Sequence, residues 1–205
     1  MDARGRGPAG VDRNELRAAV RHEYAEVADN PNQGFHFHTG RTLAQILEYS
    51  KEQIDRLPES VVESLAGTGN PFAMGALGEG ERVIDIGCGA GFDSFIAADM
   101  VGPTGSVVGI DMTPEMLLRA RAAAAEMDPD HLRFEEAYAE ELPVPDGWAD
   151  VIISNGVLNL CPDKDEVFVE MYRKLKPGGR LQIGDILVSR EVPEGAKRNI
   201  ELWTG

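Results

Sequence analysis

The sequence has few residues of the kinds that build disulfide frameworks, metal sites or membrane spans. Its 205 residues include two cysteines and four histidines. Without Cys-x-x-Cys or His-x-x-x-His spacing, these predict neither a disulfide framework nor a metal site. No apolar run approaches the length of a membrane span, and the first residues contain no hydrophobic signal region. We therefore expect a reduced, cytoplasmic protein without a metal.

Basic charge is also scarce. Twenty Lys and Arg residues stand against 35 Asp and Glu residues, so the formal net charge is −15. Because this charge repels polyanions, we expect neither nucleic acid nor a membrane as a partner. A small-molecule substrate is the expected partner, and the sequence leaves the oligomeric state open.

Apolar residues, at 42% of the chain, are sufficient for one full core. Residues 1–80 are predicted to form an N-terminal tail and a helical cap. In this part an amphipathic helix is expected from Asp12 to about Ala28, with Asp12 as its N-cap. Two short helices are expected next, within "TLAQILEYS" and "ESVVESLAG", separated by Pro58.

Residues 81–205 change to alternating strands and helices, a pattern typical of a parallel α/β sheet with helices on both faces. The helix before the last strand is expected to stop at Pro177-Gly178-Gly179. Strands are expected at 82–87, 106–111, 131–137, 149–155 and 180–188, and helices at about 91–100, 113–127 and 163–176.

The chemistry starts at "VIDIGCGAGFD", where a strand leads into three glycines at alternate positions, Gly87, Gly89 and Gly91. Glycines let the backbone approach a ligand closely. Phe92 stands where the dinucleotide fingerprint requires another glycine, which disfavours a nicotinamide oxidoreductase. Asp111 ends the next strand, where an acid accepts hydrogen bonds from ribose hydroxyls. The combination predicts a cofactor that contains adenosine.

These motifs resemble those of class I S-adenosylmethionine-dependent methyltransferases, in "VIDIGCGAGFD", "VVGIDMTPEML" and "LKPGGRL". The resemblance implies a Rossmann-like sheet of order 3-2-1-4-5, without the last two strands that such enzymes usually add, and S-adenosylmethionine as cofactor. It also implies that Glu140 accepts from the adenine amine and that Asn155 faces the methionine part. The full implied cofactor set is Asp85, Gly87, Cys88, Gly89, Gly91, Asp111, Met112, Ala139, Glu140 and Asn155.

A closer resemblance, to the arsenite methyltransferase family, extends over most of the chain from about Asn30. It is carried by "FHFHTGRTLA", "GNPFAMGAL" and "ISNGVLNLCPDKDEVFVEMYRKLKPGGRL". In that family cysteine thiolates hold the arsenic, which suits a soft trivalent centre. Two of the family's cysteines correspond here to Thr68 and Gly156. The acceptor therefore stays open between a metalloid and a small organic molecule, and a non-catalytic cofactor-binding relative is a further alternative.

Three candidates for the acceptor side are His36, His38 and Gly156. In an extended "FHFHTG" segment both histidines point the same way, so they are candidates for a lid, a proton acceptor or structural hydrogen bonds. Cys88 and Cys161 each fit either a packed thiol or a substrate contact. Their strands are expected to be neighbours, so the two thiols could approach each other. No general base stands out in the sequence.

Overall fold

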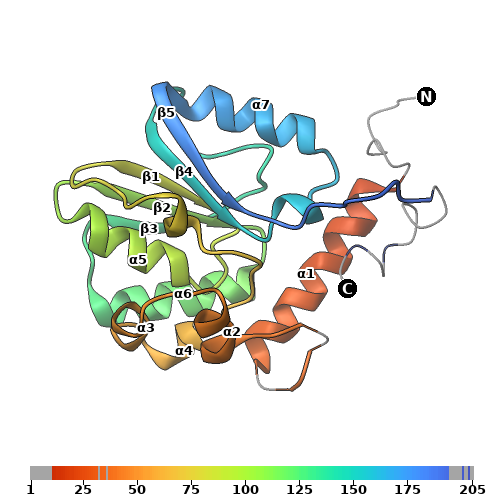
Figure 1. Cartoon of the computed structure of the whole chain (residues 1–205), viewed down its shortest axis with the longest axis horizontal. Coiled ribbons are helices and arrows are strands. Elements are labelled where there is room, and N and C mark those ends of the chain that lie inside the picture. The colour runs from red at the N-terminus through yellow and green to blue at the C-terminus, as the bar shows by residue number, and fades with distance from the viewer. Residues whose placement is uncertain (1–10, 32, 36, 194–199, 201–202, 204–205) are drawn as a thin grey trace.

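Five parallel strands form one sheet in the order β3-β2-β1-β4-β5. The computed structural model describes residues 11–31, 33–35, 37–193, 200 and 203. The strand order predicted from the resemblance is confirmed, and Figure 1 shows the twisted sheet. The strands are β1 Arg82–Ile86, β2 Ser106–Asp111, β3 Leu132–Glu136, β4 Ala149–Asn155 and β5 Leu175–Gly184.

The two central strands are almost continuously apolar because both of their faces are covered. Every residue of β1 after Arg82 is buried, and β4 is buried except at Asp150. In the register of this pair, Ile86 lies opposite Ser154. The glycine loop that follows β1 therefore begins beside Asn155, at the carboxyl edge of the sheet.

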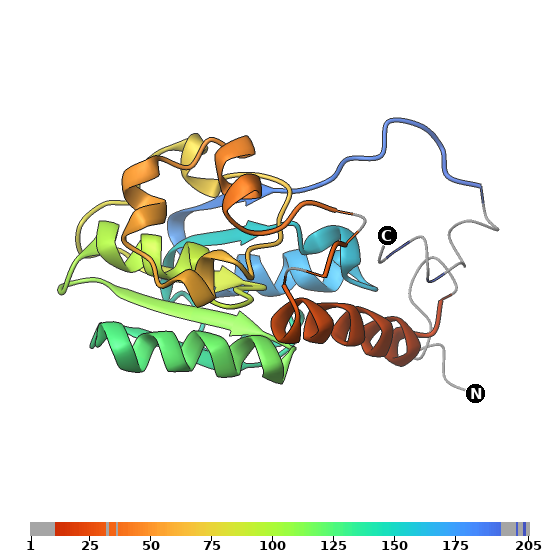
Figure 2. The same ribbon diagram turned by 90° about the horizontal axis from the view of Figure 1, so that it is seen from below.

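Helices cover both faces of the sheet (Figures 1 and 2). α5 (Phe92–Val101) and α6 (Pro114–Met127) lie on one face, and α7 (Lys164–Lys174) lies on the other. Pro114 occupies the first turn of α6, where its missing N–H costs nothing. The carboxylate of Asp163 caps α7 by accepting from Glu166 N at 3.1 Å.

The N-terminal segment begins with α1 (Arg13–Asp29), which Asp12 caps as predicted. Three short helices follow, not two: α2 (Gly40–Ile46), α3 (Lys51–Asp55) and α4 (Glu59–Val62). The unpredicted α3 begins at a capping box, in which the side chains of Ser50 and Gln53 each bond the other's backbone N–H. That pattern was visible in the sequence.

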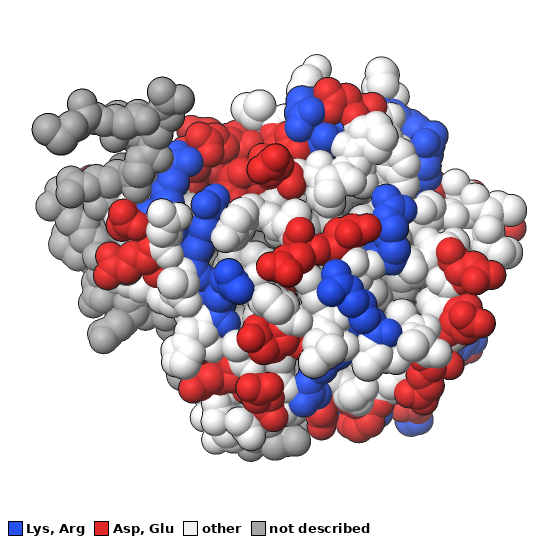
Figure 3. Space-filling model, turned by 180° about the vertical axis from the view of Figure 1, so that it is seen from behind, with Lys and Arg blue, Asp and Glu red and all other residues white. Residues whose placement is uncertain are grey.

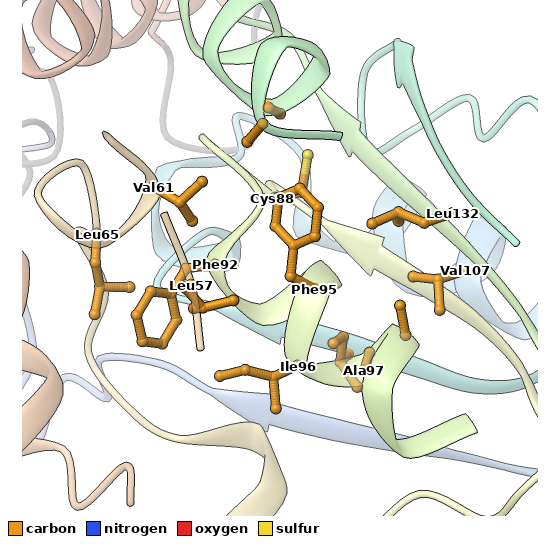
Figure 4. Close-up of a cluster of buried hydrophobic side chains, with 14 of the residues drawn as sticks. Leu57, Val61, Leu65, Cys88, Phe92, Phe95, Ile96, Ala97, Val107 and Leu132 are labelled. Carbon is orange, nitrogen blue, oxygen red and sulfur yellow. The ribbon is translucent and has the colours of Figure 1, made fainter. Parts of the chain in front are cut away.

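These short helices share one apolar core with the sheet. Ile54 and Val61 pack in the same cluster as Phe92, Phe95 and Cys88, and Figure 4 shows part of this cluster. α1 lies elsewhere, across the carboxyl end of the sheet and beside α6 (Figures 1 and 2). It is therefore placed over the ends of the strands.

The predicted boundaries of β5 are wrong at both ends. The strand begins at Leu175 and ends at Gly184, so Pro177-Gly178-Gly179 lie inside it and do not stop α7. Between Ala149 and Val151 of β4, the register with β5 shifts, so that extra β5 residues form an irregular bulge. Proline is tolerated there because β5 is an edge strand of the described sheet.

The basic residues, which are scattered along the sequence, are also scattered on the surface. On the face drawn in Figure 3, acidic and basic side chains interleave and form no continuous basic patch. Among the described helices, none is long and apolar enough to cross a membrane.

Candidate functional site

A cavity lies at the carboxyl edge of the sheet, where β1, β2 and β4 end. It is lined by all the cofactor residues predicted from the sequence except Gly91, namely Asp85, Gly87, Cys88, Gly89, Asp111, Met112, Ala139, Glu140 and Asn155. Gly156, from the predicted acceptor set, also lines it. These residues meet because the carboxyl ends of neighbouring parallel strands share one edge.

Glycine is needed at the three positions of the loop for different structural reasons. A Cβ on Gly87 would lie 2.2 Å from Val157 Cγ2, and a Cβ on Gly91 would lie 2.8 Å from Phe134 Cζ. Both positions are closed by packing, and Gly91 serves as the N-cap of α5, outside the cavity lining. A Cβ on Gly89 would meet nothing closer than Met116 Sδ at 3.8 Å. Gly89 is thus the glycine of the three whose missing side chain leaves room for a ligand.

Asp111 is bound to the loop that it faces. Its Oδ2 accepts from Gly89 N at 2.9 Å and its Oδ1 from Thr113 N at 2.8 Å. Burial raises the pKa of this carboxyl, although these backbone donors oppose the rise. Each oxygen retains a further lone pair. The carboxylate can therefore accept from a ligand diol without losing its contacts to the loop.

Asp85 and Asp93 are two more buried acids in the cavity lining. Ser94 Oγ donates to Asp85 at 2.6 Å, and the Tyr49 hydroxyl donates to Asp93, also at 2.6 Å. Burial raises the pKa of Asp85 and, to about 6, that of Asp93; the charge of Asp93 raises that of Asp85 further. Among the described residues no Lys or Arg pairs with either acid. This part of the cavity therefore favours a cation.

Asn155 joins the end of β4 to the loop before η2 (Pro71–Met74). Its Oδ1 accepts from Thr68 N at 2.8 Å and Gly69 N at 3.0 Å. Its Nδ2 donates to the Tyr49 hydroxyl at 3.2 Å and to Asp93 at 3.1 Å. The amide thus holds the cap on the sheet, and its role toward the methionine part of a cofactor stays a prediction.

Gly156 and Thr68, where the arsenite methyltransferase family has cysteines, lie side by side. A Cβ on Gly156 would lie 3.3 Å from both Cγ2 and N of Thr68. The two positions are therefore in contact, and Gly156 lines the cavity whereas Thr68 does not; neither carries a thiol in this chain.

The two thiols that are present do not replace the missing pair. Cys88 packs with α5 on one face of the sheet, beside Phe95 in Figure 4, whereas Cys161 packs in the cluster on the α7 face. Burial raises the pKa of both, that of Cys161 to about 12. Both residues line the cavity, but a thiol with a raised pKa stays protonated and is a poor ligand for a metalloid.

The sequence did not predict the contribution of α1. Its residues Arg17, Val20 and Tyr24 line the cavity. The apolar spacing of the segment placed Val20 and Tyr24 on one helix side, but that pattern did not include Arg17 and did not show what the side covers. His38 is exposed and does not line the cavity, and His36 lies outside the described residues.

This architecture is that of a class I S-adenosylmethionine-dependent methyltransferase: a sheet of order 3-2-1-4-5, with a glycine loop after β1 and an acid at the end of β2 facing one cavity. Residues 77–204 match the model of a methyltransferase domain family. The chain belongs to this family.

Relatives with named activities agree with this assignment. The arsenite methyltransferase of Halobacterium salinarum is 45% identical over 139 residues, which are 68% of this chain and 36% of that protein. The demethylmenaquinone methyltransferase of Listeria monocytogenes is 38% identical over 103 residues, 50% of this chain and 44% of that protein. The matched part therefore spans less than half of either relative.

A solved structure supports the same relationship. The arsenic(III) S-adenosylmethionine methyltransferase of Chlamydomonas reinhardtii superposes with a TM-score of 0.67 and 38% identity. The alignment covers 71% of this chain and 51% of that one.

Proposed function

We propose that this chain binds S-adenosylmethionine and transfers its methyl group to a small acceptor, with arsenite or a related metalloid as the first candidate. The observation that carries the proposal is the single cavity where the glycine loop, Asp111 and Glu140 converge. Asp111 would hold the ribose, Glu140 would accept from the adenine amine, and the backbone at Gly89 would approach the ligand closely.

The charge of the cavity fits this cofactor. When bound, the cofactor supplies a methyl group on a positively charged sulfonium, which is already activated for transfer. Asp85 and Asp93 are buried without a cationic partner among the described residues, so they favour a cation in the cavity. The remaining work of the chain is to hold donor and acceptor in line and to exclude water.

The metalloid is favoured by the relatives, several of which are named arsenite methyltransferases. Because Thr68 and Gly156 carry no thiol, the chain would take the metalloid as a complex with small soluble thiols, since a soft trivalent centre prefers sulfur. The acceptor would then lie against the surface that these two residues form at the end of β4.

A small organic acceptor is the second candidate. It is favoured by the same two positions, which offer a methyl, a hydroxyl and bare backbone in place of thiolates. The similarity to a demethylmenaquinone methyltransferase points in the same direction.

The experiment is a two-stage assay. Calorimetry first compares binding of S-adenosylmethionine and of a nicotinamide dinucleotide; binding of the dinucleotide alone would overturn the proposal. S-adenosylhomocysteine formation is then measured with arsenite, with arsenite plus glutathione, and with a panel of demethylated quinols. We expect product with arsenite only when the thiol is present. Product with quinols alone would replace the metalloid by the second candidate, and cofactor binding without product from any acceptor would indicate a non-catalytic relative.

Asp111→Ala, with Asp128→Ala as its matched control, is the test variant for both stages. It removes the carboxylate expected to hold the ribose, and we expect cofactor affinity and product formation to fall together. Asp128→Ala, a change at the end of α6 outside the cavity lining, removes the same charge and should leave both unchanged.

A further inference from the structure

Arg17 of α1 and Glu140 form an ion pair in the wall of the cavity. Arg17 Nη2 lies 3.0 Å from Glu140 Oε1, and the two side chains are only 19% and 11% exposed. The guanidinium carbon of Arg17 also lies 4.1 Å from the ring centroid of Tyr138. The pair therefore joins α1 to the segment that follows β3, beside the residues expected to contact adenine.

This pair leaves hydrogen-bonding capacity unused. The 3.0 Å contact does not have hydrogen-bond geometry, and among the described residues Glu140 Oε1 and Arg17 Nε are buried without a hydrogen-bond partner. Buried polar atoms are nearly always satisfied in native proteins. An acceptor and a donor left together in a cavity wall therefore indicate a ligand that offers the complementary donor and acceptor.

Arg13, one turn earlier on α1, provides the comparison. Its Nε is also buried and unpaired, but its terminal nitrogens donate to Asp163 and Glu166 at the start of α7. Arg13 does not line the cavity. It anchors the same helix to a different part of the core.

We propose that Arg17 is a specificity-determining residue that, together with Glu140, recognises the edge of the adenine base. The inference rests on the proposed function. The exocyclic amine of adenine donates, which suits Glu140, and each ring nitrogen flanking the amine accepts, which suits Arg17 Nε–H. Hypoxanthine has an oxygen in place of the amine and would set two acceptors against each other at Glu140.

A residue that merely anchored α1 would behave differently. Loss of an anchor weakens every ligand of the cavity by the same factor, whereas loss of a base contact weakens only ligands that carry the contacted atom. The test is therefore a double-mutant cycle, in which the affinity of each protein variant is measured for ligands that keep or lack a single atom of the base.

Calorimetry would be run on the full chain with S-adenosylhomocysteine, its hypoxanthine counterpart, and its 1-deaza and 7-deaza counterparts. The wild type is expected to prefer the adenine ligand by about 100-fold or more and to lose about tenfold for one of the two deaza ligands. Arg17→Met should bind the adenine ligand about tenfold more weakly and lose less than about twofold for the same deaza ligand. The nitrogen concerned, N1 or N7, is identified by which ligand shows the effect.

Two further variants keep the result interpretable. Arg13→Met should retain the wild-type preference and the wild-type cost of the deaza ligand. Arg17→Lys keeps a positive charge beside Glu140 but has no Nε, so it should preserve the thermal midpoint and still be insensitive to the deaza change.

The inference is overturned if Arg17→Met and Arg17→Lys keep the wild-type cost of both deaza ligands, or if Arg13→Met matches Arg17→Met. If the wild type binds neither S-adenosylmethionine nor S-adenosylhomocysteine, the proposed function itself fails. Binding by the wild type with an unchanged preference in the Arg17 variants refutes only the role of Arg17.

Discussion

Replacing Asp93 by asparagine is expected to change how the stability of the protein depends on pH. Asp93 is 6% exposed and accepts from the Tyr49 hydroxyl and the Asn155 amide. Burial raises its pKa to about 6, against these two hydrogen bonds, which lower it. In Asp93→Asn the shape is kept, and the Tyr49 hydroxyl can donate to Gly69 O, 3.3 Å away, while it accepts from the new amide.

The sign follows from proton binding in the two states. The carboxyl ionises near pH 6 in the folded protein but near 3.8 as an ordinary aspartate. Between these values the folded state binds more protons, so this group stabilises the fold below about pH 4 and that contribution is lost as the pH rises to about 6. A pKa difference of about 2 corresponds to a free energy of about 3 kcal/mol. Asp85, whose pKa burial and Asp93 also raise, acts in the same direction.

The assay is urea unfolding of both proteins between pH 4 and 8, followed by circular dichroism. The free energy of unfolding of Asp93→Asn minus that of the wild type is expected to increase by about 2.5 kcal/mol from pH 4 to pH 7.5. Asp99→Asn is the matched control: Asp99 lies on the same helix, is 65% exposed and pairs with Arg56, so it should change stability by less than about 1 kcal/mol at every pH. Parallel curves for wild type and Asp93→Asn would refute the reasoning.

Three further results are expected. Gly89 has a φ of +52°, so Gly89→Ala should cost about 1 kcal/mol of backbone strain. Its Cβ would meet nothing closer than Met116 Sδ at 3.8 Å, so packing should add little to this loss, but the methyl should lower cofactor affinity in calorimetry by about tenfold or more. Unchanged affinity would place the ligand elsewhere. Gly156→Ala should lose more stability in urea than Gly147→Ala, by about 1 kcal/mol, because both have positive φ but only the first Cβ is crowded, at 3.3 Å; equal losses would show that crowding is unimportant. Iodoacetamide at pH 8 should label neither Cys88 nor Cys161 until urea is added, since both are buried with raised pKa values; mass spectrometry would detect native labelling, which contradicts this.

Much of the fold could be predicted because its strands carry local signals. Strands 106–111 and 149–155 have the predicted limits, since apolar runs end there at polar residues. β5 could not be bounded in the same way. Its first residues pair with β4 through a bulge, so its start depends on a neighbour far away in the sequence and not on local propensity. The missed helix α3 is different, because its capping box was present in the sequence.

The residues of the site also include some that the sequence could predict and some that it could not. Residues at strand ends were predictable because the topology brings the carboxyl ends of β1, β2 and β4 to one edge. Residues that close the cavity from outside the sheet were not predictable in this way. The helical spacing of Val20 and Tyr24 shows a shared side but not the surface that it covers, and Arg17 is not part of that apolar pattern.

The choice of methyl acceptor likewise depends on contacts that the sequence pattern does not reveal. Thr68 meets the end of β4 through Asn155, 87 residues later, which accepts from its N–H. The two residues proposed to face the acceptor thus lie in a contact between the N-terminal segment and the end of β4, whereas the residues proposed to hold the cofactor lie at the ends of strands or in the loops that follow them. We therefore expect changes at Thr68 and Gly156 to affect the acceptor more than the glycine loop or Asp111. This separation is why the cofactor can be inferred from motifs while the acceptor requires the assay with arsenite, thiol and quinols.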